Sequence, residues 1–383
     1  MPSIVLVAGD PSGDAQAARL ITALKQRNAS LTFSALGGPA MQQAGAALLD
    51  DLTTTAAIGP FDAARHLGRF TNAKRLFEEY VRSRHPDLAI LVDFGDFNLP
   101  VIAPIAKRHG VPVLYYISPQ VWAWGRFRLR YIRRYVERMI VLFPFEEAFY
   151  RREGIPVTWV GHPLMESAHP TMTKDDAFAR FGLNPWRRTV GLLPGSRPHE
   201  VARHLPLMIK SAQRIAWQMP GVQFLLPKAP ALPSEMLRRW TERAGVELRM
   251  AEGSVYDALQ VMEAAVVASG TATLDAALCA VPMAVVYRAS WPTYLAARCV
   301  LRIPHIAMVN ILAQRRLVPE FVQHRADPGR IARAIVELLR DTERASQVRQ
   351  ELRQVTQRLG APGAVDRAAT VVLEALRAAA STS

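Results

Sequence analysis

The chain has 383 residues, of which 50% are hydrophobic, with 47 basic and 33 acidic side chains and two cysteines. This length predicts two domains, and because no run of roughly 18 uninterrupted apolar residues occurs, the sequence offers no membrane span. The first residues lead directly into an apolar strand rather than a signal peptide, so a cytoplasmic protein is expected, and Cys279 and Cys299, which lack metal or disulfide spacing, are interpreted as packing residues.

Short apolar runs separated by helical patterns predict two series of βα units, and this alternation implies parallel sheets. The first series has strands at 3–8, 32–36, 88–93, 111–116, 138–142 and 157–160, and the second at 189–193, 222–226, 246–250, 264–268 and 283–287. Between the series, around residues 161–174, the periodicity lapses and prolines gather, which indicates a linker. After Asp327 the pattern is continuously helical, with a break at residues 360–363 and a last helix near 364–380.

The predicted fold is therefore α/β, with two doubly wound, Rossmann-like domains that face a central cleft. We place the first domain at residues 1–165 and the second at residues 175–360. The first domain is expected to bind the acceptor on the membrane side, and the second to bind the UDP-sugar. Whether the helix at about 363–383 packs back on the first domain is left open.

The first candidate site follows the predicted strand 88–93. Asp93 lies at the carboxyl end of that strand, Asp96 lies in the loop, and Asn98 opens the next helix. Open α/β sheets bind ligands at this edge, and a carboxylate here suits a general base that takes a proton from a sugar hydroxyl. We assign the catalytic role to Asp96 and a substrate contact to Asn98. Asp93 is either a second catalytic group or a residue that orients the loop.

Two glycine turns follow earlier strands of the first domain. One contains Ser12 and Asp14, and the other spans residues 37–39. Both either line the same crevice as Asp96, with Ser12 and Asp14 binding substrate, or are only tight turns.

The second domain contains two turns of the kind that bind phosphate. The run Ala265–Val267 leads into Ser269, Gly270 and Thr271 and then a helix with Thr273 and Asp275. Free backbone N–H groups and hydroxyls at such a junction suit phosphate, and Asp275 is placed to accept hydrogen bonds from a sugar diol. The alternative is an ordinary strand-to-helix junction with Thr271 as N-cap.

About 75 residues earlier, a second strand ends in a glycine turn followed by Arg197. Two such turns in one α/β domain suggest a nucleotide diphosphate held between them, with Arg197 as the fixed cation. Neither turn matches a Walker loop or the Gly-x-Gly-x-x-Gly fingerprint, so ATP hydrolysis and hydride transfer are not favoured.

The formal net charge of +14 suits nucleic acid, an anionic membrane or a phosphorylated substrate. One basic cluster stands out between Gly125 and Met139, where six arginines alternate with aromatic and aliphatic residues at helical spacing. We call Arg126–Arg138 the arginine stripe. It suits an anionic bilayer surface, or it is a core-facing helix with a basic outer side. Just before it, Trp122 and Trp124 are candidates to stack on sugar or line an acyl groove, or to lie in the core.

Nine segments in unbroken order resemble the lipid-A-disaccharide synthase family. They are AGDPSGD (8–14), LGGPAM (36–41), YISPQVWAW (116–124), FPFE (143–146), VGHP (160–163), LPGSR (193–197), ASGTATL (268–274), NILA (310–313) and VPEF (318–321). The resemblance runs from residue 3 to about residue 325.

The resemblance implies a GT-B fold and an inverting, metal-independent transfer of 2,3-diacylglucosamine from its UDP donor to 2,3-diacylglucosamine 1-phosphate, with no cofactor. It implies that Asp96 is the base, Arg197 the diphosphate cation, Asp275 the acidic residue at the ribose and Asn310 the asparagine beside the diphosphate. It also implies action at the anionic inner-membrane surface, as a peripheral protein, and leaves a homodimer open.

Four positions differ from the family pattern. The family usually has Glu at positions 10 and 275, where this chain has Asp, and Ala-Pro at positions 94 and 95, where it has Phe-Gly. These differences bear on acyl-chain and acceptor specificity rather than on the reaction class.

The sequence leaves two alternative functions open. One is a related GT-B enzyme acting on another UDP-sugar or lipid acceptor, such as an enzyme similar to a UDP-N-acetylglucosamine epimerase. The other is a non-catalytic basic protein. Nucleic acid is not favoured as its partner, since the basic residues form no recognised reading motif and the aromatic residues follow helical spacing.

Overall fold

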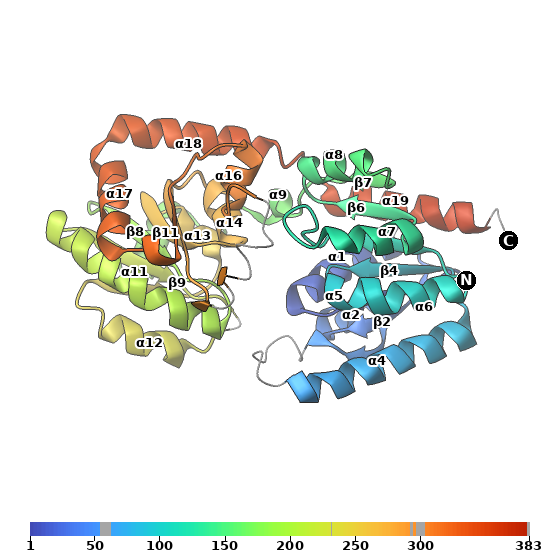
Figure 1. Ribbon diagram of the computed structural model, residues 1–383. Coiled ribbons are helices and arrows are strands. Elements are labelled where there is room, and N and C mark those ends of the chain that lie inside the picture. The colour runs from blue at the N-terminus through green and yellow to red at the C-terminus, as the bar shows by residue number, and fades with distance from the viewer. Residues whose placement is uncertain (54–62, 231, 292–293, 296–302, 381–383) are drawn as a thin grey trace. The chain divides into compact units, whose positions relative to one another are not determined.

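The computed structural model describes residues 1–53, 63–230, 232–291, 294–295 and 303–380 (Figure 1). The chain forms two compact units, each with its own parallel sheet. Unit 1 comprises Met1–Pro163 and Leu359–Ser383, and unit 2 comprises Leu164–Arg358. Cys299 lies outside the described residues, whereas Cys279 is half-buried at the end of a helix of unit 2.

The sheet of unit 1 has seven strands in the order β3-β2-β1-β4-β5-β6-β7, all parallel. The strands are β1 (Ser3–Ala8), β2 (Thr32–Gly37), β3 (Ala47–Asp51), β4 (Leu88–Val92), β5 (Val113–Tyr116), β6 (Arg138–Val141) and β7 (Val157–Trp159). The helices are α1 (Pro11–Arg27), α2 (Pro39–Gln43), α4 (Ala63–Arg84), α5 (Gly95–Phe97), the π-helical turn η2 (Asn98–Ile102), α6 (Ala103–Arg108), the 3₁₀ turn η3 (Arg126–Arg128), α7 (Leu129–Tyr135), α8 (Pro144–Arg152) and α19 (Ala364–Ala380).

Both faces of this sheet are buried, which is why its strands read as continuous apolar runs. Alternate residues of β1 point to opposite sides: Ile4 and Leu6 pack in a core with α1 and α19, and Val5 and Val7 pack in a second core with α4 and α6. The C-terminal helix α19 contacts α1 directly, with Arg27 paired to Asp366 at 3.1 Å (Figure 1). The last segment of the chain is therefore part of the first unit.

The sheet of unit 2 has six parallel strands in the order β10-β9-β8-β11-β12-β13. The strands are β8 (Thr189–Leu193), β9 (Gln223–Pro227), β10 (Leu248–Ala251), β11 (Ala264–Ala268), β12 (Met283–Tyr287) and β13 (Glu320–Val322). The helices are α9 (Leu164–Ser167), α10 (Lys174–Arg180), α11 (Pro198–Gln218), α12 (Ser234–Glu242), α13 (Val255–Leu259), α14 (Ala272–Leu278), α16 (Met308–Ala313), the 3₁₀ turn η4 (Gln323–Arg325), α17 (Pro328–Arg340) and α18 (Thr342–Gln357).

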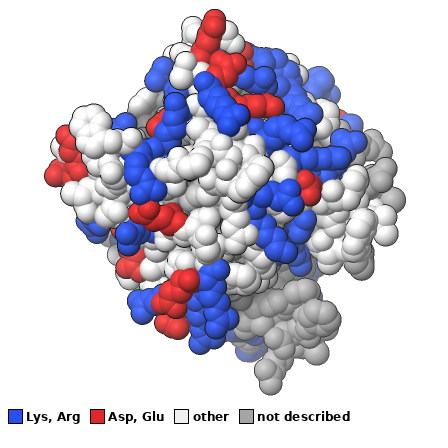
Figure 2. All heavy atoms as spheres, turned by 90° about the vertical axis from the view of Figure 1, so that its left-hand side faces the viewer, with Lys and Arg blue, Asp and Glu red and all other residues white. Residues whose placement is uncertain are grey.

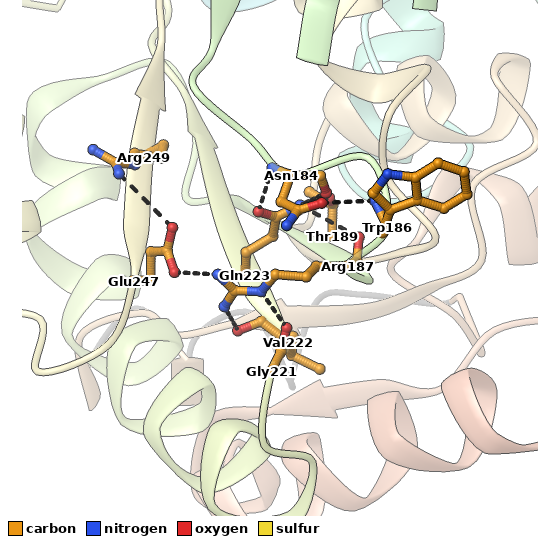
Figure 3. Close-up of polar contacts among 9 residues, drawn as sticks. All are labelled: Asn184, Trp186, Arg187, Thr189, Gly221, Val222, Gln223, Glu247 and Arg249. Atoms are coloured by element: carbon orange, nitrogen blue, oxygen red, sulfur yellow. Dashed lines mark hydrogen bonds and ion pairs between the residues drawn. The ribbon is translucent and has the colours of Figure 1, made fainter. Parts of the chain in front are cut away.

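The turn that enters β8 is held by a buried glutamine (Figure 3). Gln223, with no exposed surface, accepts from the Asn184 backbone N–H at 3.0 Å and donates to the Asn184 carbonyl at 2.7 Å. Arg187 donates to the Gly221 carbonyl at 2.7 Å and pairs with Glu247 at 2.6 Å. These contacts fix the amino-terminal edge of the sheet of unit 2.

Three details differ from the sequence-based prediction. Strands β3 and β13 were not predicted, because both are short edge strands, half-exposed and containing acidic residues that β-propensity disfavours. The helix after Asp327 is interrupted at Asp341, whose side chain accepts from the Arg344 N–H and caps α18. The predicted helix across Gly125–Met139 is instead a 3₁₀ turn, a short helix and the strand β6.

Candidate active site

In each unit the candidate residues gather where the strand order reverses. β1 and β4 are neighbours in unit 1, and their carboxyl ends lead into the Gly9–Gly13 turn and the Asp93–Asn98 turn. β8 and β11 are the equivalent pair in unit 2, and they lead into Leu193–Arg197 and Ser269–Thr273. Such switch points are the usual ligand sites of open parallel sheets.

The turn after β4 is held in an unusual backbone conformation. Asp93 and Phe94 are both left-handed, with φ of 43° and 51°. The Asp93 carbonyl accepts from the Tyr115 hydroxyl and from Asn98 Nδ2, the latter at 2.9 Å. A Cβ added to Gly9 would lie 2.2 Å from the Phe94 ring, so the glycine lets the two turns approach. Backbone strain of this kind persists where surrounding structure fixes it, often at functional sites.

Asn98 lies beneath this turn rather than on the surface. Its side chain is fully buried, and Nδ2 also lies 3.4 Å from the carbonyls of Val7 and Val92. The amide that we predicted as a substrate contact therefore connects the ends of β1 and β4.

Asp96 is exposed and paired with a buried arginine. Its side chain is 75% exposed, whereas that of its ion-pair partner Arg128 is 5% exposed. The Arg128 guanidinium lies 4.0 Å from the ring centroid of Trp124 and 5.0 Å from that of Phe127. A stacked and buried guanidinium has little freedom, so it holds the carboxylate in place.

The Asp93 carboxylate lies near two buried titratable groups. Burial raises the pKa values of Tyr115 and Glu146, and the negative charge of Asp93 raises them further. The backbone of Asp93 shapes the turn through its left-handed φ and its carbonyl group.

The loop that contains Trp122 and Trp124 is anchored to α8. Trp122 Nε1 donates to Glu146 Oε1 at 3.1 Å, and the hydroxyls of Ser118 and Tyr150 lie 2.6 Å apart. Burial raises the pKa of Glu146 to about 8, partly offset by hydrogen bonds from the Phe143 N–H and Trp122. The indole N–H of Trp122 is thus occupied within the unit.

The sequence analysis did not single out Glu146, although the residues around it match a known helix N-terminus pattern. Pro144 followed by Glu146 matches a helix N-terminus in which the glutamate reaches back to the N-cap N–H.

The turn after β1 separates the two residues predicted there. Ser12 is exposed and its hydroxyl donates to Asp10 at 2.8 Å. Asp14 is buried, and its carboxylate accepts from the backbone N–H groups of Gly38, Ala40 and Met41 at 2.9, 2.9 and 3.1 Å. Asp14 therefore caps α2, and of the pair only Ser12 lies on the surface.

In unit 2 the loop after β8 presents Arg197. Gly195 has φ of 115°, and Glu200 Oε2 accepts from the N–H groups of Ser196 and Arg197 at 3.1 and 3.2 Å. The Arg197 guanidinium is 59% exposed and 3.7 Å from Glu200. It is an exposed cation on a loop whose backbone is held by Glu200.

A buried histidine supports this loop and was not predicted. His204 Nε2 accepts from the Arg288 N–H at 3.1 Å, so Nδ1 carries the proton that it donates to the Pro194 carbonyl at 3.1 Å. Burial lowers the pKa of His204, which favours the neutral ring, and the two hydrogen bonds set its tautomer. It ties the loop after β8 to the end of β12.

The turn after β11 combines a strained glycine with a half-buried carboxylate. Gly270 has φ of 150°, and the Thr273 hydroxyl donates to the Gly270 carbonyl at 2.8 Å. Thr271 is the exposed N-cap of α14, but its hydroxyl does not cap the helix. Asp275 accepts from the Tyr256 hydroxyl at 2.8 Å, and burial raises its pKa.

Two other predicted contacts in unit 2 are used internally. The Ser269 hydroxyl donates to the Ile306 carbonyl at 3.0 Å. Asn310 is fully buried, donates to Val318 and Glu320, and accepts from the N–H groups of Leu317 and Val318. Asn310 therefore builds the loop before β13.

The arginine stripe is not one continuous surface. Ile132 and Val136 are buried in the core, Arg128 is buried beside Asp96, and Arg126 and Arg133 pair with Glu153. Of the two alternatives, the core-facing helix with a basic outer side describes this segment better, because its aliphatic side chains point inward. The exposed side chains of the stripe include Phe127 and five arginines: Arg126, Arg130, Arg133, Arg134 and Arg138. Of these, Arg130 and Arg134 lie over the rings of Tyr131 and Tyr135.

The part of the chain that the structure describes has neither a membrane-spanning helix nor a cluster of metal ligands. No helix in the described ranges is both long and apolar enough to cross a bilayer. In the same ranges, no three His, Cys, Asp or Glu side chains are grouped as metal ligands.

The sequence profile of the family described as lipid-A-disaccharide synthetase matches residues 4–374. The chain belongs to the lipid-A-disaccharide synthase family. It is 42% identical over 373 residues to the lipid-A-disaccharide synthase of Geobacter sulfurreducens, covering 97% of each chain. It is 40% identical over 360 residues to that of Nitrosococcus oceani, covering 94% of this chain and 93% of the relative. Members of the lipid-A-disaccharide synthase family are glycosyltransferases.

Solved structures with similar folds support the architecture of this lipid-A-disaccharide synthase family member. An S. aureus MnaA–UDP structure matches with a TM-score of 0.66 at 11% identity, covering 96% of this chain and 94% of that one. The UDP-GlcNAc 2-epimerase from Neisseria meningitidis bound to UDP-GlcNAc matches with a TM-score of 0.65 at 13% identity, covering 98% and 100%. The calicheamicin glycosyltransferase CalG4 matches with a TM-score of 0.61 at 16% identity, covering 98% of each chain. The fold is therefore GT-B, as predicted.

Proposed function

We propose that this chain transfers 2,3-diacylglucosamine from its UDP donor to 2,3-diacylglucosamine 1-phosphate, with inversion at the anomeric carbon and without a metal ion. Family membership supports the reaction class. The main structural support for the catalytic role of Asp96 is its exposed carboxylate, which the buried Arg128 holds at the switch point of unit 1.

Asp96 acts as the general base. As the acceptor hydroxyl oxygen attacks the anomeric carbon, Asp96 takes the hydroxyl proton and the bond from that carbon to the diphosphate oxygen breaks. Attack on the face opposite the leaving group inverts the carbon. The fixed turn at Asp93 sets where the Asp96 carboxylate lies, and Ser12 on the adjacent turn offers a contact to the acceptor.

Unit 2 binds the UDP part of the donor. The exposed Arg197 guanidinium compensates the charge that develops on the departing diphosphate, and Gly270 and Thr271 provide the neighbouring turn. Asp275 has one oxygen bonded to Tyr256 and a second oxygen suited to a ribose hydroxyl. The likeness to a MnaA–UDP structure supports this placement of UDP.

The acylated substrates bring the protein to an anionic inner-membrane surface as a peripheral protein. Within the arginine stripe, we assign this contact to Arg130, Arg134 and Phe127. These side chains are exposed and, unlike Arg126 and Arg133, are not paired with Glu153. We also propose that the chain forms a homodimer, which sedimentation velocity would test.

The test is mass spectrometry of lipid products after incubation with diacylated UDP-glucosamine and the diacylated 1-phosphate acceptor. We expect the tetraacyl disaccharide 1-phosphate, and a loss of roughly 10²-fold or more in turnover for Asp96→Asn with UDP affinity retained. Epimerisation of UDP-N-acetylglucosamine without disaccharide formation would favour the alternative enzyme. Near-normal turnover by Asp96→Asn would remove Asp96 as the base.

A further inference from the structure

A groove runs between α11 and α12 on the outside of unit 2. Its volume is about 720 Å³, and its apolar lining includes Pro206, Ile209, Met236 and Trp240. Pro206 lies nine residues after Arg197 on α11, which places the groove roughly 14 Å or more along the helix from the nucleotide edge. The groove is therefore separate from the proposed UDP site.

The two helices are fixed relative to each other. Gln213 of α11 donates to the Ala244 carbonyl, just after α12, at 2.8 Å. The helix α12 also packs against β10, and its Leu237 is fully buried. The groove is therefore a stable concavity rather than a gap between loose segments, and ligand sites of this volume are typically pre-formed.

The rim of the groove is basic. Lys210, Arg239 and Arg243 line it, with Glu235 as the acidic lining residue. Glu235 is already engaged by Arg239 at 3.5 Å and Arg238 at 3.9 Å, and within the described ranges no carboxylate forms an ion pair with Lys210 or Arg243. Two cations beside an apolar groove thus lack a counter-charge. Lys and Arg also outnumber Asp and Glu on the side of unit 2 shown in Figure 2.

Tryptophans lie at the same surface. Trp240 lines the groove and is 36% exposed. Trp217 is 85% exposed and lies seven residues after Lys210, so both are on one face of α11. Tryptophan beside basic residues is typical of surfaces that meet the head-group region of a bilayer.

From these observations we propose that the α11–α12 groove binds an anionic membrane phospholipid, with an acyl chain in the groove and the head-group phosphate at Lys210 and Arg243. The combination selects for an amphiphile: the apolar lining excludes a purely ionic ligand, and the unpaired cations favour a negative head group. This site is additional to the arginine stripe of unit 1 and does not depend on the reaction that the enzyme performs.

The test compares co-sedimentation of the full chain with equimolar phosphatidylglycerol–phosphatidylcholine vesicles and with pure phosphatidylcholine vesicles. The variant Lys210→Glu with Arg243→Glu should bind the anionic vesicles roughly 30-fold or more weakly, since each basic residue at an anionic surface contributes about fivefold. The matched control is Arg330→Glu with Arg333→Glu, exposed residues of α17 in the same unit with the same change of charge. The control should lose much less binding.

Further measurements separate the groove from general charge effects. Trp240→Ser should lower binding by about tenfold at low and at high salt, because it removes apolar contact that salt does not screen. A monomeric short-chain phosphatidylglycerol should bind to the wild type in calorimetry, whereas glycerol phosphate should not compete with it. UDP calorimetry on every variant checks that unit 2 is folded.

Several results would overturn the proposal. Equal losses in the groove variant and the α17 control would show a general electrostatic field. Competition by glycerol phosphate would show an anion site without a lipid chain. A dimer of the wild type that Lys210→Glu with Arg243→Glu dissociates would show that a second copy of the chain covers the groove.

Discussion

Arg128 connects Asp96 to the aromatic loop of unit 1, because it pairs with the Asp96 carboxylate while its guanidinium lies 4.0 Å from the ring centroid of Trp124. The loop itself is anchored on α8 through Trp122 and Glu146. The position of the proposed base therefore depends on residues about 30 to 50 positions later in the chain.

Replacing Arg128 tests this dependence. Arg128→Lys keeps the positive charge but removes the planar guanidinium, which stacks on Trp124 and pairs with Asp96. We therefore expect kcat to fall about tenfold. UDP affinity should stay at the wild-type value, since Arg128 belongs to unit 1. Arg130→Lys, an exposed neighbour, is the matched control. Unchanged kcat in Arg128→Lys would mean that Asp96 is positioned without its partner.

Arg197→Met tests the diphosphate site. Loss of a charge-assisted hydrogen bond should weaken UDP binding by about 1.5–3 kcal/mol in calorimetry. Arg203→Met, which removes an exposed guanidinium from α11, the helix that follows Arg197, should leave UDP binding unchanged. In parallel, EDTA should not change turnover. If EDTA abolished activity and Mg²⁺ restored it, the metal-independent mechanism would be wrong.

The pKa of Glu146 predicts a pH dependence of stability. The pKa is raised from 4.5 to about 8, so between these values the folded state keeps a proton that the unfolded state has lost. The Glu146 contribution therefore falls as pH rises from about 4.5 to 8, with a slope that approaches about 1.4 kcal/mol per pH unit. Glu146→Gln cannot ionise, so urea unfolding of the variant should lack this fall. Parallel pH profiles for both proteins would contradict the burial of an ionisable group there.

Much of the fold could be predicted from the sequence, because strands buried on both faces are continuous apolar runs. The strands that were missed, β3 and β13, lie at sheet edges, where this pattern is weak. The helix boundary within the arginine stripe was also missed, since Ile132 and Val136 fit both a surface stripe and a core-facing side.

The sequence predicted where the ligand sites lie better than it predicted which residues are free to bind a ligand. The motifs located both switch points, but spacing along the chain does not reveal which polar atoms are already bonded. Asp14, Asn98 and Asn310 are buried and bonded to backbone groups, whereas Asp96 and Arg197 are exposed. Contacts such as His204 to Pro194 and Arg288 join segments far apart in sequence and have no local signal.

The exposed part of the arginine stripe is expected to bind anionic membranes. If Arg130 and Arg134 meet the bilayer, binding to anionic vesicles should fall as salt shortens the Debye length below about 8 Å. Arg130→Glu with Arg134→Glu should reduce vesicle binding in co-sedimentation while UDP affinity stays unchanged, because the UDP residues belong to unit 2. Exposed Phe127 should leave a salt-resistant remainder, since apolar insertion is not screened.

The control for this variant is Arg19→Glu with Lys107→Glu, two exposed positions of the same unit on α1 and α6. It changes the net charge equally, so a general electrostatic effect would weaken both variants alike. A specific contact would weaken only the variant in the stripe. Full sedimentation of that variant with anionic vesicles at low salt would show that Arg130 and Arg134 face solvent when the protein is bound, and that its membrane contact lies elsewhere.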